Sequence, residues 1–234
     1  MNLVTYYQLK LLFFRRKRRR MQDPFLWHKM FDIQLRSLKD GIFRPMCKYV
    51  PSVVTPLHIT AAAFVVGFFS CYFSTTKNIQ ISLTLWALNR ALDCLDGALA
   101  RHRGTASDLG GFLDLLGDFI VYSLLPISIA AGWDNTASAW KAVAVLEASF
   151  HINNFVLFYV AAVAEKRVPK GGVKAKELTS VMMRPALVEG TESGLIFTAM
   201  LAWPGEIEWW CWGMAGLVAV GIAQRVACTV PALS

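Results

Sequence analysis

Six long apolar segments, separated by short polar stretches, make up most of the sequence after residue 50. A hydrocarbon core about 30 Å thick is crossed by about 20 predominantly apolar residues of helix. The pattern therefore predicts an all-α polytopic membrane protein, with a six-transmembrane-helix bundle forming one domain at 51–234. We expect the spans at residues 57–74, 80–100, 108–131, 138–163, 186–203 and 209–230.

The first 50 residues differ from the rest in charge and pattern. Residues 1–22 contain no acid and include six consecutive basic residues at 15–20, which predicts a basic arm that binds anionic membrane lipid. An organelle-targeting segment is the alternative, since such segments are also rich in arginine and poor in acids. Residues 23–50 predict an N-terminal amphipathic helix at the membrane interface, although its apolar stripe suits packing against the protein's own helices equally well: Trp27, Phe31, Leu35, Leu38 and Ile42.

Basic residues are distributed unevenly among the connections between the spans. The net charge is +8. If the N-terminus is inside, however, the only basic residues in the outer loops are Lys77 and Lys141. By the positive-inside rule, the N-terminus and the inner loops then face the cytoplasm or its topological equivalent. Nucleic acid is a poor partner for this charge, because the basic residues flank membrane spans. An interfacial aromatic belt is expected at the outer ends, formed by Trp133, Trp140, Trp203, Trp209, Trp210 and Trp212.

Residues 93–118 interrupt the apolar pattern with acids and glycines. Helical spacing places one group of these residues on a single face: Asp93, Asp96, Gly97, Ala100 and Arg101. A second group recurs every fourth residue on the next helix: Gly110, Asp114 and Asp118. A short basic turn at 102–105 would bring the two stripes face to face, so four carboxylates would share one site.

Four carboxylates within apolar helices require a compensating cation. Each costs about 2.5–3.5 kcal/mol at the centre of a membrane. Arg101 supplies one positive charge, and a divalent metal is the natural remainder. Oxygen-only ligands favour Mg²⁺, Mn²⁺ or Ca²⁺ over Zn²⁺, and the small Gly97 and Gly110 leave room for a ligand beside the acids. The five cysteines show no metal-ligand spacing, so we expect them to serve packing.

The uninterrupted spacing D-x2-D-G-x2-A-R-x8-G-x3-D-x3-D resembles the signature of the CDP-alcohol phosphotransferase family. All eight fixed positions are present between Asp93 and Asp118. The resemblance implies an enzyme of phospholipid biosynthesis that transfers a phosphatidyl group from a CDP-linked lipid, such as CDP-diacylglycerol, to a small hydroxyl acceptor and releases CMP. It also implies a metal cofactor, two Mg²⁺ ions or Mn²⁺ in their place, and a homodimer.

By the same resemblance, the signature residues divide into separate roles. Asp93, Asp96 and Asp114 would ligate one metal, and Asp118 would share a second metal or act as general base on the acceptor hydroxyl. Crowding by three other carboxylates makes such a group a better proton acceptor, whereas bound metal opposes that effect. Direct transfer is expected, because no residue stands out as a nucleophile. The nucleotide side would consist of Gly97, Ala100, Arg101, Ser107 and Gly110.

The acceptor is the least constrained part of the predicted reaction. Glycerol phosphate, inositol phosphate, inositol and serine all serve as acceptors within the family. The basic segment at 166–184 favours an anionic acceptor, although the positive-inside rule explains the same charges. Arg184 and Glu189, at the start of the fifth span, are candidate acceptor-binding residues; an interfacial position alone is the equal alternative.

Polar residues in other spans predict helix starts and contacts between helices. Thr55 and Pro56 are expected as the cap and first-turn proline of the first span. His58 and Thr60 follow as polar candidates for the site. The fourth span carries a polar group for which hydrogen bonding between helices is expected ahead of substrate contact: Glu147, His151, Asn153 and Asn154.

Other classes of protein also use acidic residues within the membrane. Asp-rich membrane prenyltransferases bind a pyrophosphate through Mg²⁺, but the signature glycines and the six spans argue against that class. A non-enzymatic cation transporter would explain the acids but not the glycines or Arg101. An inactive homologue is disfavoured because the signature is complete. Metal-dependent release of CMP separates the enzyme from both alternatives.

Overall fold

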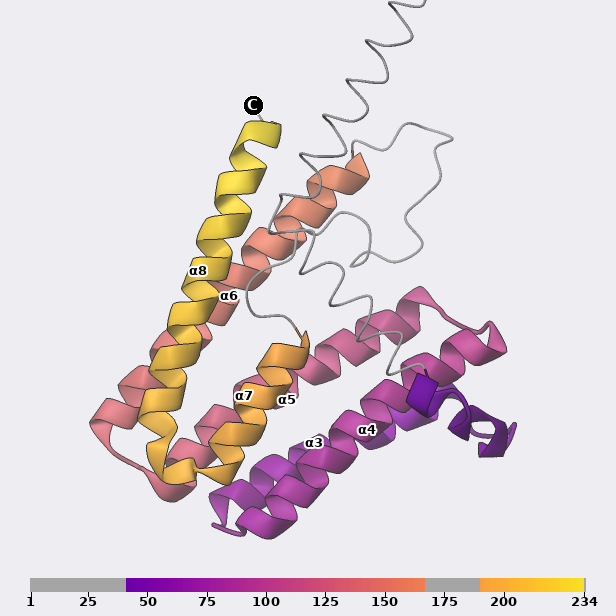
Figure 1. The fold of residues 1–234 in the computed structure, drawn as a ribbon, viewed down its shortest axis with the longest axis horizontal. Coiled ribbons are helices and arrows are strands. Elements are labelled where there is room, and N and C mark those ends of the chain that lie inside the picture. Colours follow the sequence, from indigo (N-terminus) through magenta and orange to yellow (C-terminus); the bar gives the residue numbers. More distant parts are fainter. Residues whose placement is uncertain (1–40, 167–189, 234) are drawn as a thin grey trace, which may run out of the picture. The chain divides into compact units, whose positions relative to one another are not determined.

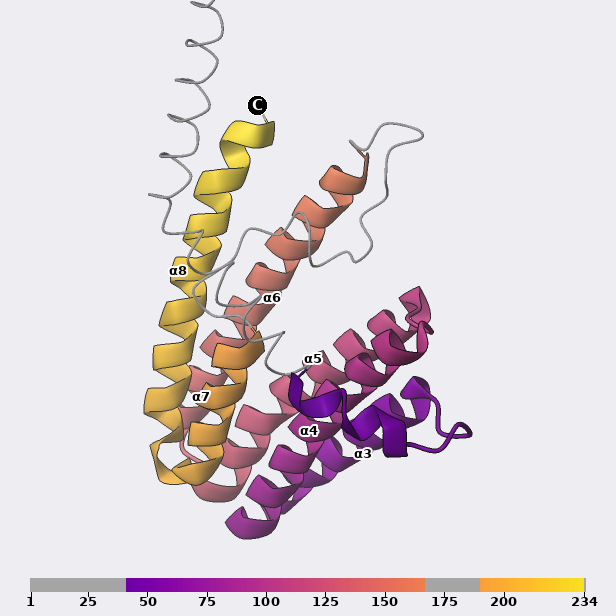
Figure 2. The same ribbon diagram turned by 45° about the vertical axis from the view of Figure 1, so that its right-hand side comes forward.

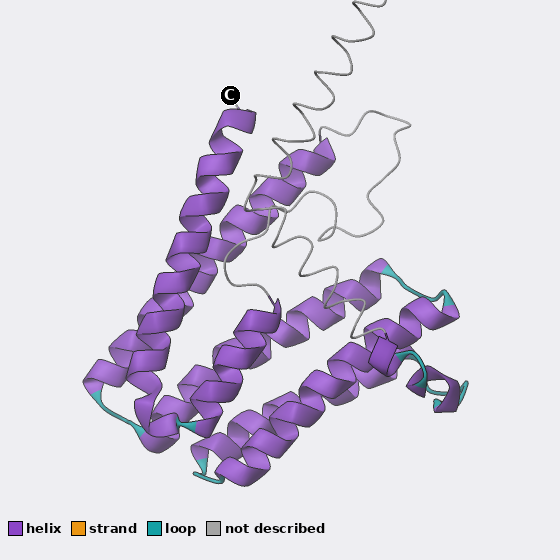
Figure 3. Ribbon diagram, viewed as in Figure 1, coloured by secondary structure: helices purple, strands orange, loops and turns teal. Residues whose placement is uncertain are grey.

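The computed structural model describes residues 41–166 and 190–233, which belong to one unit, Asp40–Ser234 (Figure 1). The described chain consists of helices and short connections, without a strand among them (Figure 3). The all-α prediction is therefore confirmed for these residues. The predicted arm at 1–22, residues 23–40 of the predicted interfacial helix and the loop at 167–189 lie outside the described residues. The elements are η1 (Met46–Tyr49), α3 (Pro56–Thr75), α4 (Ile79–Arg103), α5 (Asp108–Trp133), α6 (Ala137–Lys166), α7 (Gly190–Ala202), η2 (Pro204–Glu206) and α8 (Ile207–Leu233).

A helix occupies each of the six predicted spans, with ends that differ from the prediction by a few residues. Three of these helices are long and apolar enough to cross a membrane: α3, α5 and, over Ala137–Val163, α6. Helix α4 carries the charged residues of the acidic stretch, and α7 has 13 residues. These helices support a membrane protein, and the full six-span arrangement stays a prediction.

Helix α3 packs along both α4 and α5 (Figures 1 and 2). Small side chains allow membrane helices to approach closely, and hydrogen bonds between helices then stabilise the contact. The buried face of α3 follows this rule, with Ala63, Gly67, Ser70 and Ser74. The hydroxyls of Ser70 and Ser82 each donate to the other residue's carbonyl oxygen at 2.8 Å, which joins α3 to α4.

A second group of helices is formed by α6, α7 and α8. Helix α6 runs beside α8, and the shorter α7 contacts α4, α5 and α8 (Figures 1 and 2). The main buried cluster includes Trp86, Leu125, Leu146 and Phe197, each at most 1% exposed. Trp86 also donates its indole N–H to the Thr198 hydroxyl at 2.8 Å. The cluster therefore connects α4 and α5 to the second half of the chain.

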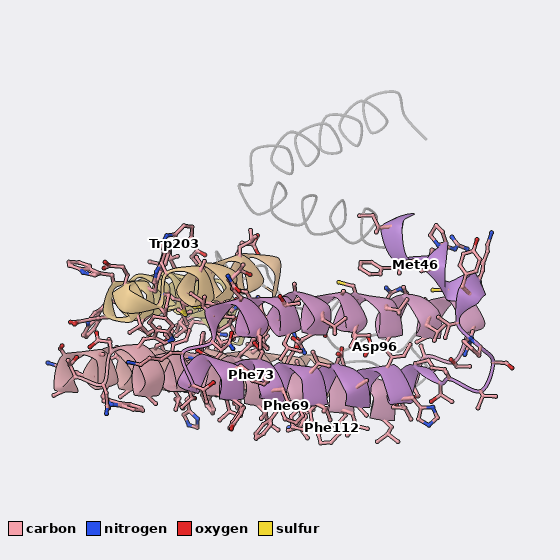
Figure 4. All side chains as sticks on the ribbon, turned by 90° about the horizontal axis from the view of Figure 1, so that it is seen from below. Met46, Phe69, Phe73, Asp96, Phe112 and Trp203 are labelled. Atoms are coloured by element: carbon pink, nitrogen blue, oxygen red, sulfur yellow. The ribbon has the colours of Figure 1, made fainter. Side chains whose placement is uncertain are left out.

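The tryptophans of the predicted aromatic belt lie at helix ends. Trp133 ends α5, and the first turn of α6 contains Trp140. Trp203 follows α7, and the three remaining tryptophans lie within two turns of the start of α8. Figure 4 shows Trp203 at the opposite end of the described helices from Met46. These positions fit an interfacial belt, and the side of the membrane that it faces stays a prediction.

Candidate active site

The turn between α4 and α5 brings the two halves of the acidic stretch back towards each other. Gly104 ends α4 with a φ of 65°, in the left-handed region where glycine is favoured, and the Thr105 N–H bonds to the Ala100 carbonyl at 2.9 Å. Ser107 begins α5, where its hydroxyl accepts the Gly110 N–H at 3.1 Å. The turn therefore occupies 104–107. The turn predicted at 102–105 was placed two residues early, because His102 and Arg103 continue the helix.

The four signature carboxylates form one electrostatic cluster. Each interacts with at least two of the others, and the Asp93 and Asp114 carboxyl groups lie within hydrogen-bonding reach of each other. Asp96 is 5% exposed, and Asp93 and Asp118 are half-buried. Asp96 lies within the packed helices, nearer to Met46 than to Trp203 (Figure 4). The structure thus brings together Asp93, Asp96, Asp114 and Asp118, which the sequence places on two stripes.

A divalent metal fits the chemistry of this cluster. Carboxylate oxygens are the ligands that Mg²⁺ and Mn²⁺ prefer, and four of them interact across α4 and α5. As they stand, no three acidic, histidine or cysteine side chains of the described chain are grouped closely enough to hold an ion. One oxygen of Asp118 is bonded to an arginine.

Arg90, one turn before Asp93 on α4, is a cation that contacts the acids. Its Nη2 donates to Asp118 Oδ1 at 2.7 Å, and its Nη1 lies 3.7 Å from Asp93 Oδ2. Nη1 also donates to the Tyr122 hydroxyl at 2.6 Å. The sequence predicts Arg101 as the compensating charge and overlooks Arg90. An arginine three residues before the first signature acid, within an apolar helix, is the signal that identifies it.

The candidates for the nucleotide side lie along the last turns of α4 and the start of α5: Gly97, Ala100, Arg101, Ser107 and Gly110. The Arg101 side chain lies over Gly97, where a Cβ atom would be 3.1 Å from Nη1. The sequence predicts room for a ligand beside Gly97, and in the structure the Arg101 guanidinium lies next to that position. Ser107 and Arg101 are both exposed. The hydroxyl of Ser107 is the N-cap of α5, a structural role that the sequence did not separate from substrate contact.

Helix α3 contributes a hydroxyl to the cluster. Thr60 donates to Asp96 Oδ2 at 2.6 Å, so this polar candidate does contact a signature acid. The start of the helix is as predicted, with Thr55 as the cap and Pro56 in the first turn. His58 completes a capping box, because its backbone N–H donates to the Thr55 hydroxyl and its Nδ1 accepts the Thr55 N–H at 3.3 Å. A cap therefore accounts for His58 without a ligand role.

An arginine at the end of α4 fixes the connection that leads into α3. Arg103 donates to the carbonyl oxygens of Val54 at 2.6 Å, Val50 at 2.8 Å and Pro51 at 3.0 Å. Charge-assisted bonds of this kind are stronger than neutral ones. The start of α3, and with it Thr60, is therefore tied to the end of the helix that carries Asp96.

The predicted acceptor residues, Arg184 and Glu189, lie outside the described residues. In the fourth span, Asn153 accepts a hydrogen bond from Arg225 Nη1 at 3.1 Å, which joins α6 to α8. Hydrogen bonding between helices is therefore confirmed for Asn153.

A pocket lies beside the last turns of α4. It is lined by Arg44, Ala98, Arg101 and His102, and its basic side chains suit an anionic group.

The sequence of this chain is similar to a known protein family and to two relatives. The sequence model of a family described as CDP-alcohol phosphatidyltransferase matches residues 48–215, which include the whole acidic stretch. The inner membrane protein YnjF of Escherichia coli (strain K12) is 34% identical over 154 residues, 64% of this chain and 71% of that protein. Archaetidylinositol phosphate synthase of Pyrococcus horikoshii is 34% identical over 87 residues, 36% of this chain and 46% of that protein. The second match thus covers less than half of either chain.

Proposed function

Because the chain belongs to the CDP-alcohol phosphatidyltransferase family, we propose that it transfers a phosphatidyl group from CDP-diacylglycerol to a phosphorylated hydroxyl acceptor. The family uses a CDP-alcohol donor and an alcohol acceptor, and the chain is accordingly a membrane phosphotransferase of phospholipid synthesis. The membrane prenyltransferase and cation-transporter alternatives are set aside by the family assignment. The observation that carries the proposal is the clustering of all four signature carboxylates on α4 and α5.

The proposed reaction requires the site to neutralise the charge of the phosphates and to accept a proton from the acceptor hydroxyl. The acceptor oxygen bonds to the phosphorus that carries the diacylglycerol, the bond to the bridging oxygen breaks, and CMP leaves. A bound divalent ion, of a kind on which this family generally depends, supplies charge neutralisation and Lewis acidity at the phosphate oxygens. Asp93, Asp96 and Asp114 would hold one ion, and Asp118 would either share a second ion or act as the general base, of which we propose the second. Asp118 Oδ2 would take the proton of the acceptor hydroxyl, since Oδ1 is bonded to Arg90.

The end of α4 supports a role in binding the nucleotide and its phosphates. Gly97 and Ala100 are small, and the Arg101 side chain lies over Gly97 and lines the basic pocket with Arg44 and His102. A guanidinium binds phosphate through several parallel N–H donors. We assign Gly97, Ala100, Arg101, Ser107 and Gly110 to this side of the site, with Ser107 also capping α5.

A phosphorylated acceptor, glycerol phosphate or inositol phosphate, suits the basic character of this protein. The segment at 166–184 is rich in basic residues, and Arg184 and Glu189 remain the proposed acceptor contacts. The archaeal relative is named as a synthase of an inositol phosphate lipid. We further propose that the N-terminus and the site face the cytoplasm, that the arm at 1–22 binds anionic lipid, and that the protein is a homodimer.

Release of CMP by the purified protein tests the function and the acceptor together. With CDP-diacylglycerol and Mg²⁺, we expect glycerol phosphate or inositol phosphate to support release, whereas inositol and serine do not. EDTA is expected to abolish release, and added Mg²⁺ or Mn²⁺ to restore it. Chromatography of CMP and mass spectrometry of the lipid product provide the measurement. Release with inositol or serine alone would contradict the phosphorylated acceptor, and no release with any acceptor would contradict the donor.

Thr60→Val is expected to slow CMP release by about 10-fold to 100-fold, because a hydrogen bond to a charged group contributes about 1.5–3 kcal/mol. Valine matches the shape of threonine but cannot donate to Asp96 Oδ2. Thr84→Val is the matched control, since the Thr84 hydroxyl is exposed and donates to the Gln80 carbonyl of its own helix. Initial rates of CMP release provide the comparison. Equal rates for the two variants would show that the Thr60 hydroxyl does not contribute to the reaction.

A further inference from the structure

We propose that Arg90 is a positioning residue, which holds Asp118 by one oxygen so that the other faces the acceptor hydroxyl. Arg90 lies outside the eight signature positions. The inference rests on the proposed function, because it assigns Arg90 a task in the same reaction. It concerns the direction in which the Asp118 carboxylate points and the charge beside it.

All three nitrogens of the Arg90 guanidinium are engaged. Nη2 donates to Asp118 Oδ1 at 2.7 Å, Nη1 to the Tyr122 hydroxyl at 2.6 Å, and Nε to Asn89 Oδ1 at 2.8 Å. A guanidinium is a planar fork, so three bonds in different directions leave it one orientation. Asp118 therefore meets a cation whose position is already fixed by Tyr122 and Asn89.

The surroundings of Arg90 make this arrangement rigid. The guanidinium carbon lies 4.9 Å from the ring centre of Trp86 and 5.0 Å from that of Tyr122, within the range of cation–π attraction. Trp86 is 1% exposed and Asn89 is 2% exposed. Asn89 also donates to the Ala63 carbonyl at 2.7 Å, which ties the network to α3. Three helices thus determine where the cation sits.

The hydrogen bond of 2.7 Å to Arg90 distinguishes Asp118 from Asp93, whose Oδ2 lies 3.7 Å from Arg90 Nη1. Asp118 can bind a metal through both oxygens only if Oδ1 leaves the arginine. With Oδ1 retained by Arg90, only Oδ2 is left for a metal or for the acceptor proton, and the Tyr122 hydroxyl also lies within hydrogen-bonding reach of this carboxylate. Asp96 is instead held by the Thr60 hydroxyl, which carries no charge. While the bond to Arg90 holds, Asp118 therefore cannot bind a metal through both oxygens, and the geometry leaves its second oxygen for the acceptor proton.

Two substitutions separate the charge of Arg90 from its geometry. Arg90→Met removes the charge and the fork, whereas Arg90→Lys keeps the charge but lacks the fork. For Arg90→Met, we expect a kcat for CMP release lower by about 100-fold, with the KM for CDP-diacylglycerol changed by less than about twofold. For Arg90→Lys, we expect a loss of about 10-fold, since one point donor cannot reproduce the geometry.

Metal affinity provides a readout that general damage to the fold would not reproduce. Arg90→Met removes a positive charge beside the acids and frees Asp118 Oδ1, so Mn²⁺ measured by electron paramagnetic resonance should bind about tenfold more tightly. Arg90→Lys should bind Mn²⁺ like the unmodified protein. In a protein that already carries Asp118→Asn, adding Arg90→Met should increase the Mn²⁺ affinity much less, because the two residues act as a pair. Slower turnover with tighter metal binding is the expected signature.

Arg103→Met is the structural control, since Arg103 lies on the same helix and donates to three backbone carbonyls. It should lower the temperature of unfolding without tightening Mn²⁺ binding. If Arg90→Met retains kcat within twofold per folded molecule, the inference is wrong and the proposed function stands. If the unmodified protein releases no CMP, the proposed function is wrong. The Mn²⁺ affinities of the single and double variants then still test whether Arg90 holds Asp118. Independent effects of the two substitutions, or no Mn²⁺ binding at all, would overturn that pairing.

Discussion

Asp118→Asn is expected to lower the rate of CMP release by about 1,000-fold, within the range of about 10²–10⁴ for loss of a general base. Asparagine has the size of aspartate, and its carbonyl oxygen can still accept the bond from Arg90 Nη2. It carries no charge and cannot take a proton from the acceptor hydroxyl. The fold and the binding of the CDP-lipid should therefore survive. Single-turnover release of CMP with Mg²⁺ and acceptor in excess provides the measurement.

Asp108→Asn is the matched control for this loss. Asp108 lies in the first turn of the same helix and is exposed, whereas Asp118 is half-buried and bonded to Arg90. The substitution removes the same charge, and an acid in the first turn interacts with the helix dipole by only about 0.3–1 kcal/mol. We expect the Asp108 variant to retain most of its activity. A tenth or more of normal activity in Asp118→Asn, or an equal loss in Asp108→Asn, would contradict the base role.

The helices could be predicted from the sequence because the signals for them are local. Apolar segments of sufficient length give the positions of the spans, and caps and glycine give their ends. Thr55 with Pro56 marks the start of α3, and Gly104 marks the end of α4. The turn was misplaced by two residues because two basic residues resemble a loop in sequence. In the structure they lie in the last turn of α4, where cations are favoured.

The acids of the site could also be predicted, because their spacing alone places them on facing helices. The particular acid that each partner contacts could not, although the spacing of Arg90 from Asp93 marks Arg90 as a candidate. Arg90 on α4 contacts Asp118 on α5. This contact depends on the distance between the two helix backbones and on the aromatic rings that pack against the guanidinium. Sequence spacing contains neither quantity. Arg101 was assigned part of the compensating charge, beside a metal, because it shares a predicted helix face with the acids, whereas Arg90 lies before the acidic stretch at 93–118.

Polar residues near a helix start illustrate a second limit of the sequence. Serine, threonine and histidine serve both as caps and as contacts to ligands, so their type and position do not separate the roles. The structure gives His58 and Ser107 capping bonds, whereas Thr60, one turn further along α3, reaches Asp96. The difference lies in the direction of each side chain, which follows from helix packing.

Gly132→Ala is expected to destabilise the protein by about 1–3 kcal/mol, the usual cost of overpacking a close contact. A Cβ atom at Gly132 would lie 2.7 Å from the Ser74 carbonyl oxygen and 2.8 Å from that of Thr75. These are backbone atoms, so they cannot turn aside as a flexible side chain would. The shift would also disturb the bond of 3.2 Å from the Trp133 indole N–H to the Ser74 carbonyl. The apparent unfolding temperature in detergent, at one fixed scan rate, provides the measurement.

Gly111→Ala, on the same helix, makes the same chemical change where no atom lies within 4 Å of the added Cβ. Alanine is favoured over glycine within a helix by about 0.5–1 kcal/mol, so this variant should be unchanged or slightly more stable. The two substitutions therefore have opposite expected signs, and helix propensity cannot explain the difference. If Gly132→Ala were as stable as Gly111→Ala, α3 and α5 would not pack as closely as described.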